Sequence, residues 1–200
     1  MKFLKRHAYA LVFTLFLMGA NVYSLLKVFV IPSAVSTVSA NTTSSTTASS
    51  TASTSTGKVT KTDTTYKDDN MDIKITTGKT SDTTYYVADI QLSSADYLKT
   101  ALAQNTYGTN ITDTTSSIAQ QNNAIFAING DYYGANQSGY VIKNGQVYRD
   151  TDRNSDYEDL AVYSDGSFKT FNESDTTAQK LVDSGVVNTF AFGPTLVENG

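Results

Sequence analysis

The chain has 200 residues, contains no cysteine or tryptophan, and carries its one histidine, His7, near the amino terminus. These absences exclude a Ser-His-Asp or Cys-His nucleophilic site, and they exclude a zinc site built from Cys and His. The net charge is −4, but beyond residue 40 eleven Lys and Arg stand against nineteen Asp and Glu, which gives −8. A nucleic-acid partner would require a basic face, so we expect none.

The amino-terminal segment combines a basic flank with a long apolar run. Residues 1–7 contain three basic side chains, and residues 8–26 contain no charge. We therefore expect a cytoplasmic basic segment over 1–7 and a transmembrane signal anchor over 8–31. The bulk of the chain would then be extracellular, on a single-pass protein of the cell membrane. The alternative is a removed signal peptide, with the small residues Val38-Ser39-Ala40 as its cleavage site.

A low-complexity segment follows the apolar run. Between Asn41 and Gly57 every residue is Ser, Thr or Ala. Such a composition has almost no apolar surface to bury, so nothing offsets the entropy cost of ordering it. We predict a flexible, disordered stalk over residues 32–66, which separates the anchor from a folded domain over residues 67–200.

The first elements of this domain are predicted as a hairpin and two short helices. Residues 71–75 alternate between apolar and polar side chains, as a half-buried strand does, and residues 84–92 supply the partner strand. A short helix is expected over residues 95–104 after Ser93-Ser94, and a second one ends near residue 122. The predicted fold class is α+β, with a mixed or mainly antiparallel sheet of hairpins and short helices.

The central stretch is expected to carry the site. Residues 124–128 form an apolar run that predicts a buried strand, and Asn129-Gly130 ends it. Asp131, Tyr132 and Tyr133 then lie in a loop on a rigid strand, which is where binding and catalytic residues concentrate. The alternative is a plain polar loop between two strands. Asn144-Gly145 next predicts a hairpin of residues 140–143 and 146–149, because both turn residues favour positive φ.

The remaining elements follow the same turn signals. A second hairpin is predicted over residues 159–163 and 167–171 around Asp165-Gly166. A helix over residues 176–184, capped by Ser174 or Asp175, ends at Gly185, and a strand over 186–192 precedes Gly193-Pro194. The run from 195 to 198 ends on Asn199-Gly200, a turn signal with no second strand behind it. We expect a domain that is truncated at its carboxy end.

Four segments resemble, in order, the phosphodiester glycosidase family: AIFAINGDYYG, GYVIKNGQVYR, DLAVYSDGSF and FAFGPTLVENG. That family includes N-acetylglucosamine-1-phosphodiester alpha-N-acetylglucosaminidase and bacterial members associated with exopolysaccharide. The resemblance covers residues 73–200 and implies a hydrolase of sugar-1-phosphodiester bonds in surface polysaccharide or glycoconjugates. It places Asn129, Gly130 and the aromatic pair Tyr132 and Tyr133 beside the active site. Phe192, Gly193 and Pro194 match a segment that precedes the second half of the family pattern, and Gly193 is a further substrate-binding candidate. The family pattern continues with an arginine-containing strand and an Asp-Gly-Gly-Gly-Ser segment, neither of which this chain contains, so the fragment is expected to be inactive alone.

Two carboxylates are expected to carry the chemistry, because glycosidases place a pair of them beside the scissile bond. Asp131 is the first candidate, since partial desolvation beside two tyrosines would suit it for proton transfer. Glu158 is the second candidate, with Asp159 as its alternative. The competing interpretation of Asp131 is an Asp that accepts hydrogen bonds from backbone amides in a turn.

Substrate binding is predicted for a separate set of side chains. Tyr132 and Tyr133 could stack on a sugar face, or could pack in the core with exposed hydroxyls. Arg149 could bind the phosphodiester through its guanidinium, or could be a surface arginine at a strand end. A noncatalytic carbohydrate-binding module or pseudoenzyme that uses the two tyrosines is the alternative function.

No cofactor is expected. The acidic residues that follow the predicted Asn144-Gly145 hairpin could bind Ca²⁺ through oxygen ligands, but their spacing is not that of an EF-hand and a solvated charged loop is the alternative. These residues are Asp150, Asp152, Asp156, Glu158 and Asp159. The predicted partners are therefore a carbohydrate or sugar-phosphate substrate and the membrane, the latter through the amino-terminal helix.

Overall fold

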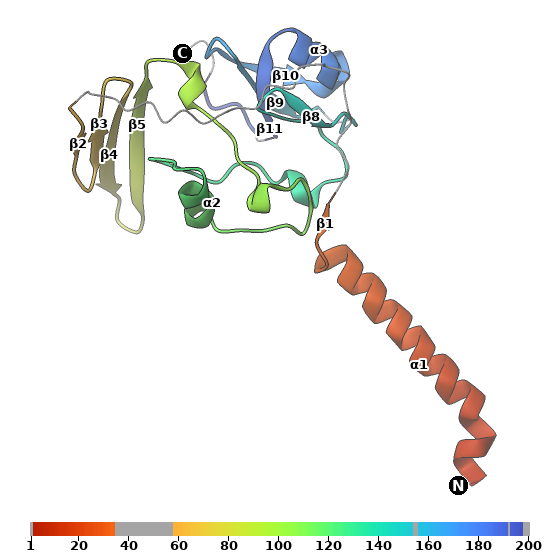
Figure 1. Ribbon diagram of the computed structural model, residues 1–200. Helices are drawn as coiled ribbons and strands as arrows, with labels where there is room; N and C mark the ends of the chain where they lie inside the picture. The colour runs from red at the N-terminus through yellow and green to blue at the C-terminus, as the bar shows by residue number, and fades with distance from the viewer. Residues whose placement is uncertain (1, 35–57, 154–155, 192, 198–200) are drawn as a thin grey trace.

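The computed structural model describes residues 2–34, 58–153, 156–191 and 193–197. A long amino-terminal helix leads to a domain of short helices and small sheets (Figure 1). Every strand pairing among these residues is antiparallel, which confirms the predicted α+β class. The Ser/Thr-rich stalk predicted over residues 32–66 falls mainly on residues 35–57, which lie outside the described residues.

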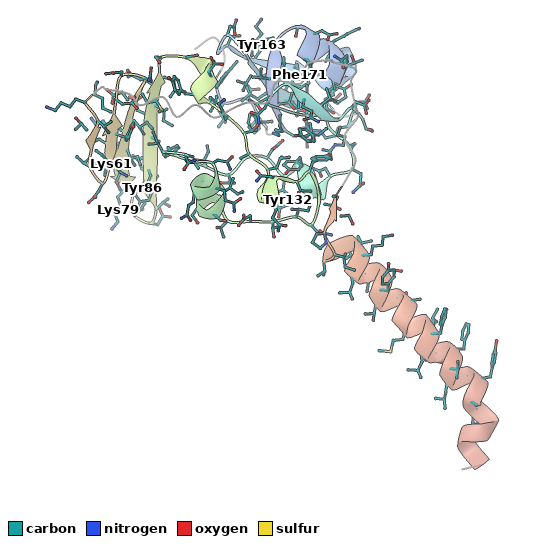
Figure 2. The ribbon with its side chains drawn as sticks, in the orientation of Figure 1. Lys61, Lys79, Tyr86, Tyr132, Tyr163 and Phe171 are labelled. Atoms are coloured by element: carbon teal, nitrogen blue, oxygen red, sulfur yellow. The ribbon has the colours of Figure 1, made fainter. Side chains whose placement is uncertain are left out.

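Helix α1 (Lys2–Phe29) contains an apolar stretch, His7–Phe29, of 23 residues. At 1.5 Å per residue this stretch is about 35 Å long, enough to cross a hydrocarbon core of about 30 Å. Its side chains project into open space along the helix (Figure 2). By length and composition the helix is compatible with a single-pass anchor, and a signal sequence has the same properties.

A four-stranded sheet with the order β2-β3-β4-β5 stands at one side of the domain (Figure 1). Its strands are β2 (Thr60–Lys61), β3 (Thr65–Lys67), β4 (Met71–Lys79) and β5 (Thr84–Leu92). The predicted hairpin is confirmed, although β4 runs on through Gly78, over which the ring of Tyr85 lies. Most side chains of this sheet are exposed, and Ile73 is its buried core residue.

The hydrophobic core lies in the carboxy-terminal half. A three-stranded sheet, β10-β9-β11, packs with a hairpin, β7-β8, and a helix, α3. These elements are β7 (Val141–Lys143), β8 (Gln146–Arg149), β9 (Glu158–Tyr163), β10 (Phe168–Asn172), α3 (Ala178–Asp183) and β11 (Val186–Phe190). The buried core residues are Tyr140, Ile142, Val147, Ala161, Ala178, Leu181 and Val186. Both predicted hairpins are confirmed, with φ positive at Asn144, Gly145 and Gly166.

The short helices agree with the sequence only in part. Helix α2 (Thr115–Gln121) begins after Thr114, whose side chain accepts a hydrogen bond from the Ser117 amide. Helix α3 begins after Thr177, not after Ser174 or Asp175, which lie in the 3-10 turn η4 (Glu173–Asp175). It ends, as predicted, before Gly185 at φ +100°.

The single helix predicted over residues 95–104 is wrong. Two 3-10 turns, η1 (Ala95–Tyr97) and η2 (Ala103–Asn105), replace it. Between them, the Thr100 amide donates to Asn144 Oδ1 at 3.2 Å, and its hydroxyl donates to Asn188 Oδ1 at 2.8 Å. The Thr100 amide therefore donates to a distant side chain and not to a backbone carbonyl within a helix. Tertiary contacts therefore override a modest local helix propensity.

The buried strand predicted over residues 124–128 is also wrong. The structure assigns no strand there, and Ile125 and Ile128 are 45% and 75% exposed. A strand needs a partner for its backbone amides and carbonyls, and no strand of the described residues pairs with this segment. Residues 195–197 likewise form no strand, while Phe192 and residues 198–200 lie outside the described part of the chain.

Candidate functional site

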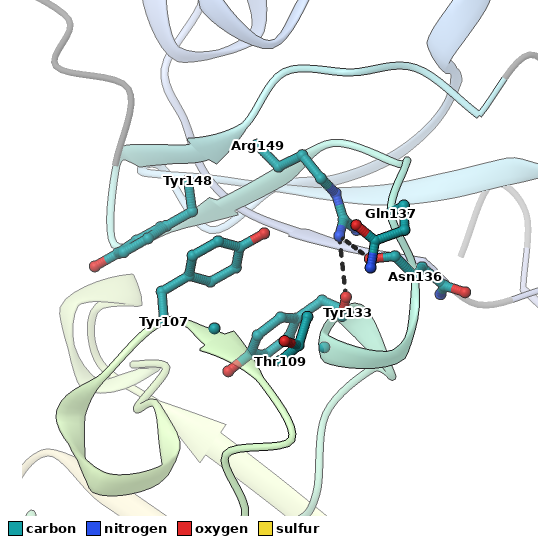
Figure 3. A pocket seen from close by; sticks show the side chains of 9 residues that line it. Tyr107, Thr109, Tyr133, Asn136, Gln137, Tyr148 and Arg149 are labelled. Atoms are coloured by element: carbon teal, nitrogen blue, oxygen red, sulfur yellow. Dashed lines mark hydrogen bonds between the residues drawn. The ribbon is translucent and has the colours of Figure 1, made fainter. Parts of the chain in front are cut away.

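A pocket of about 150 Å³ lies where β6 (Gly108–Thr109), the 3-10 turn η3 (Tyr133–Ala135) and β8 meet (Figure 3). Small-molecule sites usually enclose about 300–1,000 Å³, so this hollow holds part of a ligand rather than a whole one. Its lining consists of Tyr107, Gly108, Thr109, Tyr133, Gly134, Asn136, Gln137, Tyr148 and Arg149.

Three tyrosines form one wall of the pocket. The ring centroids of Tyr107 and Tyr133 are 5.4 Å apart with the planes 19° from parallel, and those of Tyr107 and Tyr148 are 5.1 Å apart. Burial raises the pKa of Tyr107 and of Tyr133 above the ordinary value, so both phenols stay protonated at neutral pH. Tyr107 is buried between the other two rings, whereas Tyr133 and Tyr148 are half-buried and keep apolar ring surface of the kind that suits a sugar ring.

Arg149 closes the opposite wall and is held by backbone carbonyls. Its Nη1 donates to the Tyr133 oxygen at 3.0 Å and to the Asn136 oxygen at 2.5 Å, while Nε donates to the Gly139 oxygen at 2.5 Å (Figure 3). A guanidinium has five N–H donors, so two donors on Nη2 are taken by no described carbonyl. Arg149 is therefore held by the carbonyl oxygens of its own loop, and its guanidinium also hydrogen-bonds the Tyr107 side chain.

Asp131 lies beside this loop in a buried ion pair. Its Oδ1 is 3.0 Å from Lys143 Nζ, its Oδ2 accepts from the Ala191 amide at 3.1 Å, and the two side chains are 3% and 5% exposed. Lys143 also donates to the Thr189 oxygen at 2.7 Å and lies 4.0 Å from the Phe190 ring centroid. Burial lowers the pKa of Lys143, while Asp131 opposes that effect. The pair joins the loop to β7 and β11.

The other predicted residues are spread around the site. Glu158 is exposed at the start of β9 and accepts from Thr195 Oγ1 at 2.7 Å. Asn129 and Tyr132 are exposed, and Gly130 lies against the Phe190 ring. Gly193 precedes a cis proline and has open space around its Cα.

The structure thus brings Tyr133 and Arg149 together at the pocket. Asp131 is linked to Tyr133 through Lys143, whose Nζ lies 5.9 Å from the Tyr133 ring centroid. Glu158 and Gly193 do not line the pocket.

Sequence reasoning missed Tyr107 and Tyr148, which complete the aromatic wall. Tyr107 lies between the two predicted short helices, where no element is expected, and Tyr148 belongs to the predicted strand of residues 146–149. The sequence signal beside Tyr107 is the glycine at position 108. In the structure, a Cβ at that position would lie 2.0 Å from the Ser33 oxygen. A tyrosine beside a glycine that permits close backbone approach indicates a packed loop rather than a free one.

A second charge cluster, outside the pocket lining, joins the buried carboxyl groups of Asp159 and Glu173 to Arg153. Arg153 Nη2 bonds Asp159 Oδ1 and lies 3.7 Å from Glu173 Oε1. Glu173 also accepts from the Tyr140 amide at 2.5 Å and from the Arg153 amide at 2.6 Å. Burial, reinforced by a hydrogen bond with Glu173, raises the pKa of Asp159 to about 7. Glycosidase acids have such raised values, but this carboxyl is 1% exposed and does not line the pocket.

The acidic stretch considered for Ca²⁺ is arranged differently from a cation site. Among the described residues, no three Asp, Glu, His or Cys side chains gather closely enough to hold a metal ion. Asp159 pairs with Arg153, and Glu158 pairs with Thr195.

Comparisons with known proteins bear on the same part of the chain. Residues 122–200 match the family model described as phosphodiester glycosidase, so the predicted resemblance is confirmed over that segment. The chain is also 31% identical over 97 residues to the SPbeta prophage-derived uncharacterized protein YomE of Bacillus subtilis (strain 168). That match covers 46% of this chain and 15% of the relative's length. No solved structure matches the chain. The matched family segment contributes Tyr133, Tyr148 and Arg149 to the pocket.

Proposed function

We propose that this chain carries the sugar-recognition part of a phosphodiester glycosidase, anchored by α1 with its domain outside the cell. The substrate class would be a sugar-1-phosphodiester in surface polysaccharide or a glycoconjugate. One observation carries the proposal: the segment that matches the family model contributes the η3 and β8 walls of the pocket. Family membership of that segment and the chemistry of the pocket therefore point to the same ligand.

The pocket residues divide naturally between the two parts of such a ligand. The half-buried rings of Tyr133 and Tyr148, supported by the buried ring of Tyr107 between them, offer apolar surface for the sugar, and the protonated Tyr133 hydroxyl suits its oxygens. Arg149 is the one cation in the described lining, and its positive charge suits an anionic phosphate oxygen. This assignment needs no basic surface elsewhere, which agrees with the acidic balance of the domain.

Hydrolysis would break the bond between sugar C1 and the phosphate oxygen. Water would add its oxygen to C1, and its remaining proton would pass to the released phosphate monoester, so the products are a free sugar and that monoester. We propose Asp131 and Glu158 as the carboxylates that serve this step. Asp131 does not line the pocket, and its ion pair with Lys143 holds the loop that carries Tyr133. Positioning of this loop is therefore the role that its geometry supports best.

Release of free sugar from a model sugar-1-phosphodiester tests the proposal. The protein should be made from its whole reading frame, in membranes, beside Tyr133→Ala and Asp131→Asn variants. We expect the unsubstituted protein to release sugar and both variants to lose at least tenfold in rate. Tyr133→Phe keeps the ring stack and removes only the hydroxyl, so its rate separates the contribution of the ring from that of the hydroxyl. Absence of sugar release by the unsubstituted protein would overturn the proposal.

A noncatalytic carbohydrate-binding module is the second candidate. The observation in its favour is that no carboxylate stands among the described residues that line the pocket. Glycan binding separates the two functions, because a module needs the aromatic wall and no proton donor. Binding that survives Asp131→Asn but is lost in Tyr133→Ala, without any sugar release, would identify the module.

A further inference from the structure

The end of the amino-terminal helix is built into the domain. Strand β1 (Ser33–Ala34) follows α1 and pairs antiparallel with β6, with Ser33 opposite Thr109 and Ala34 opposite Gly108. The approach is so close that a Cβ on Gly108 would lie 2.0 Å from the Ser33 oxygen. Only a glycine fits there without moving β1. The Ser/Thr-rich segment begins after this strand, so it does not separate α1 from β6.

Asn110 makes a second connection to the same helix. Its side-chain amide donates to the Val28 oxygen at 3.0 Å and to the Ile31 oxygen at 3.3 Å. The last carbonyls of a helix have no partner within the helix and need one elsewhere. A residue about eighty positions further along the chain supplies it here, from a backbone conformation with φ +57° that Asn tolerates better than most residues. The end of α1 is thus tied to the domain by side-chain and backbone contacts.

The strand that receives β1 is also a wall of the pocket. Gly108 and Thr109 of β6 line it, and a Cβ on Gly134 of η3 would lie 3.2 Å from the Gly108 oxygen. The exposed apolar surface of α1 continues through Phe29 and Val30 to the residues just before β1. One strand spacing, about 4.8 Å, therefore separates the chain that leaves the apolar helix from the pocket wall.

The surroundings of the junction agree with a membrane interface. Figure 1 shows α1 leaving the domain at β1, at the opposite end from α3. Figure 2 places Tyr132 on the same side of the domain as that junction, and its side chain is 80% exposed just before η3. Exposed tyrosines at the ends of membrane helices lie at the level of the lipid headgroups.

We infer that the pocket lies at the membrane surface and takes a sugar-1-phosphodiester whose second ester carries a membrane lipid. The sugar and phosphate rest on the proposed function; the lipid follows from the fixed contact between α1, β6 and the pocket. Confining enzyme and ligand to one surface raises their effective concentration, commonly by about 10²–10⁴. A polymer dissolved above the surface would gain nothing from a pocket held at the bilayer.

A cysteine pair tests the contact itself. These 200 residues contain no cysteine, so Ser33→Cys with Thr109→Cys introduces the one cysteine pair among them, and the unsubstituted protein in membranes serves as the background. Opposed residues of antiparallel strands have Cα atoms about 4.5–5.5 Å apart, within reach of a disulfide. We expect cross-linking of this pair, its loss when Gly108→Val is added, and none for the control pair of Ser33→Cys with Thr170→Cys on β10. Absence of the first cross-link would overturn the inference.

Fluorescence quenching tests the depth of the pocket. Ala135→Cys places a fluorophore on η3 beside the pocket, and Lys180→Cys places one on α3, with both residues exposed. In vesicles that contain lipids with nitroxide headgroups, we expect at least threefold stronger quenching at position 135 than at position 180. Equal quenching would overturn the membrane position.

The same label at position 135 reports on the ligand. A lipid-linked sugar-1-phosphodiester in vesicles is compared with a short, soluble ester of the same sugar phosphate. We expect half-saturation at a bulk concentration at least tenfold lower for the lipid-linked ligand, and equal values would overturn the lipid class. If neither ligand changes the signal while the cross-link forms, the proposed sugar-phosphate function fails and the membrane contact stands.

Discussion

The two larger sheets of the domain have similar sequence patterns and very different environments. The β4-β5 hairpin alternates over nine paired positions, yet Ile73 is its one buried apolar residue. In the β10-β9-β11 sheet, by contrast, Ala161, Val162 and Val186 are almost fully buried. The difference lies in what covers each sheet, because β7, β8 and α3 contribute residues to the core around the second one. Alternating apolar and polar residues are enough to form a hairpin, but its apolar face becomes part of a core only where a second layer of helices or strands covers it.

Polar groups follow the same division. The packed region contains buried side chains whose hydrogen bonds join distant segments, as buried polar groups require. Asn188 Oδ1 accepts from the Asn144 amide at 2.9 Å, and Thr189 Oγ1 accepts from the Ile142 amide at 3.0 Å. The exposed sheet holds its charges at the surface, such as Lys67 paired with Asp72. Substitutions should therefore separate the two regions.

Loss of the buried lysine should have the largest effect. Lys143→Met leaves the Asp131 carboxylate buried without its cation, which usually costs about 3–5 kcal/mol of unfolding free energy. Lys74→Met, on the exposed face of β4, removes the same charge and should change stability by less than about 0.5 kcal/mol. Denaturant unfolding in detergent measures both.

The double variant Asp131→Asn with Lys143→Met sharpens this result. Removing both charges leaves no uncompensated ion, so most of the loss should be recovered. A double variant as unstable as Lys143→Met alone would show that packing around the lysine, and not the ion pair, holds the loop.

The pH dependence of stability should be the next largest effect. The folded-state pKa of Asp159 is raised from 3.8 to about 7, so the folded protein holds a proton that the unfolded chain releases. Its contribution is complete below about pH 4 and is lost as pH rises through 7, by about 4 kcal/mol. Asp159→Asn should remove this slope, because the amide does not titrate. The groups that face Asp159 are Arg153 and Glu173.

The control for this experiment comes from the other sheet. Asp89→Asn on β5 replaces an exposed carboxylate and should leave the slope between pH 4 and 7 unchanged. Unfolding midpoints of both variants, measured between pH 4 and 7, show whether Asp159 causes the slope. A slope that persists in Asp159→Asn would place the titrating group elsewhere.

Truncation of one isoleucine to alanine in each of the two sheet regions should have the third largest effect on stability. Ile142 on β7 is fully buried, so Ile142→Ala removes contacts on every side and should cost about 3 kcal/mol. Ile90 on β5 is 40% exposed, so Ile90→Ala should cost about 1 kcal/mol. Equal losses would show that the four-stranded sheet is covered in solution.

The parts of the fold that sequence predicted are those decided locally. Asn144-Gly145 sets its turn with two residues of positive φ, and Gly166 supplies the positive φ of the second turn, so both hairpins followed. The run at residues 124–128 failed because a strand needs a partner, which local sequence does not reveal. The helix over 95–104 failed because Thr100 bonds to residues 44 and 88 positions away.

The candidate site divides in the same way. Tyr133 and Arg149 could be predicted because Asn129-Gly130 indicates the loop and Asn144-Gly145 indicates the hairpin. Tyr107 was missed because its contact with Tyr133 joins segments that no local pattern relates. The partner of Asp131 is Lys143, twelve residues away on another element, so its ion pair was equally hidden. Long-range pairing supplies the charge environment, and the chemistry of a carboxylate depends on that environment.

Two glycines give the smallest and most local test of the comparison. Gly145, in the turn of the packed β7-β8 hairpin, has φ +79° and open space around its Cα, so Gly145→Ala costs only backbone strain, about 1–2 kcal/mol. Gly145→Asn should cost less, since Asn tolerates positive φ. Gly78, in the exposed sheet, lies under the Tyr85 ring, 2.1 Å from a Cβ built there.

The Tyr85 ring is half exposed and can rotate into solvent, so a Cβ at position 78 costs little unfolding free energy. A strand residue also gains about 0.5–1 kcal/mol when Gly becomes Ala, because the unfolded chain loses freedom. Gly78→Ala should therefore change the unfolding free energy by less than about 0.5 kcal/mol, despite the closer contact. A larger loss than that of Gly145→Ala would mean that Tyr85 is held in place, and that the exposed sheet is packed against something in solution.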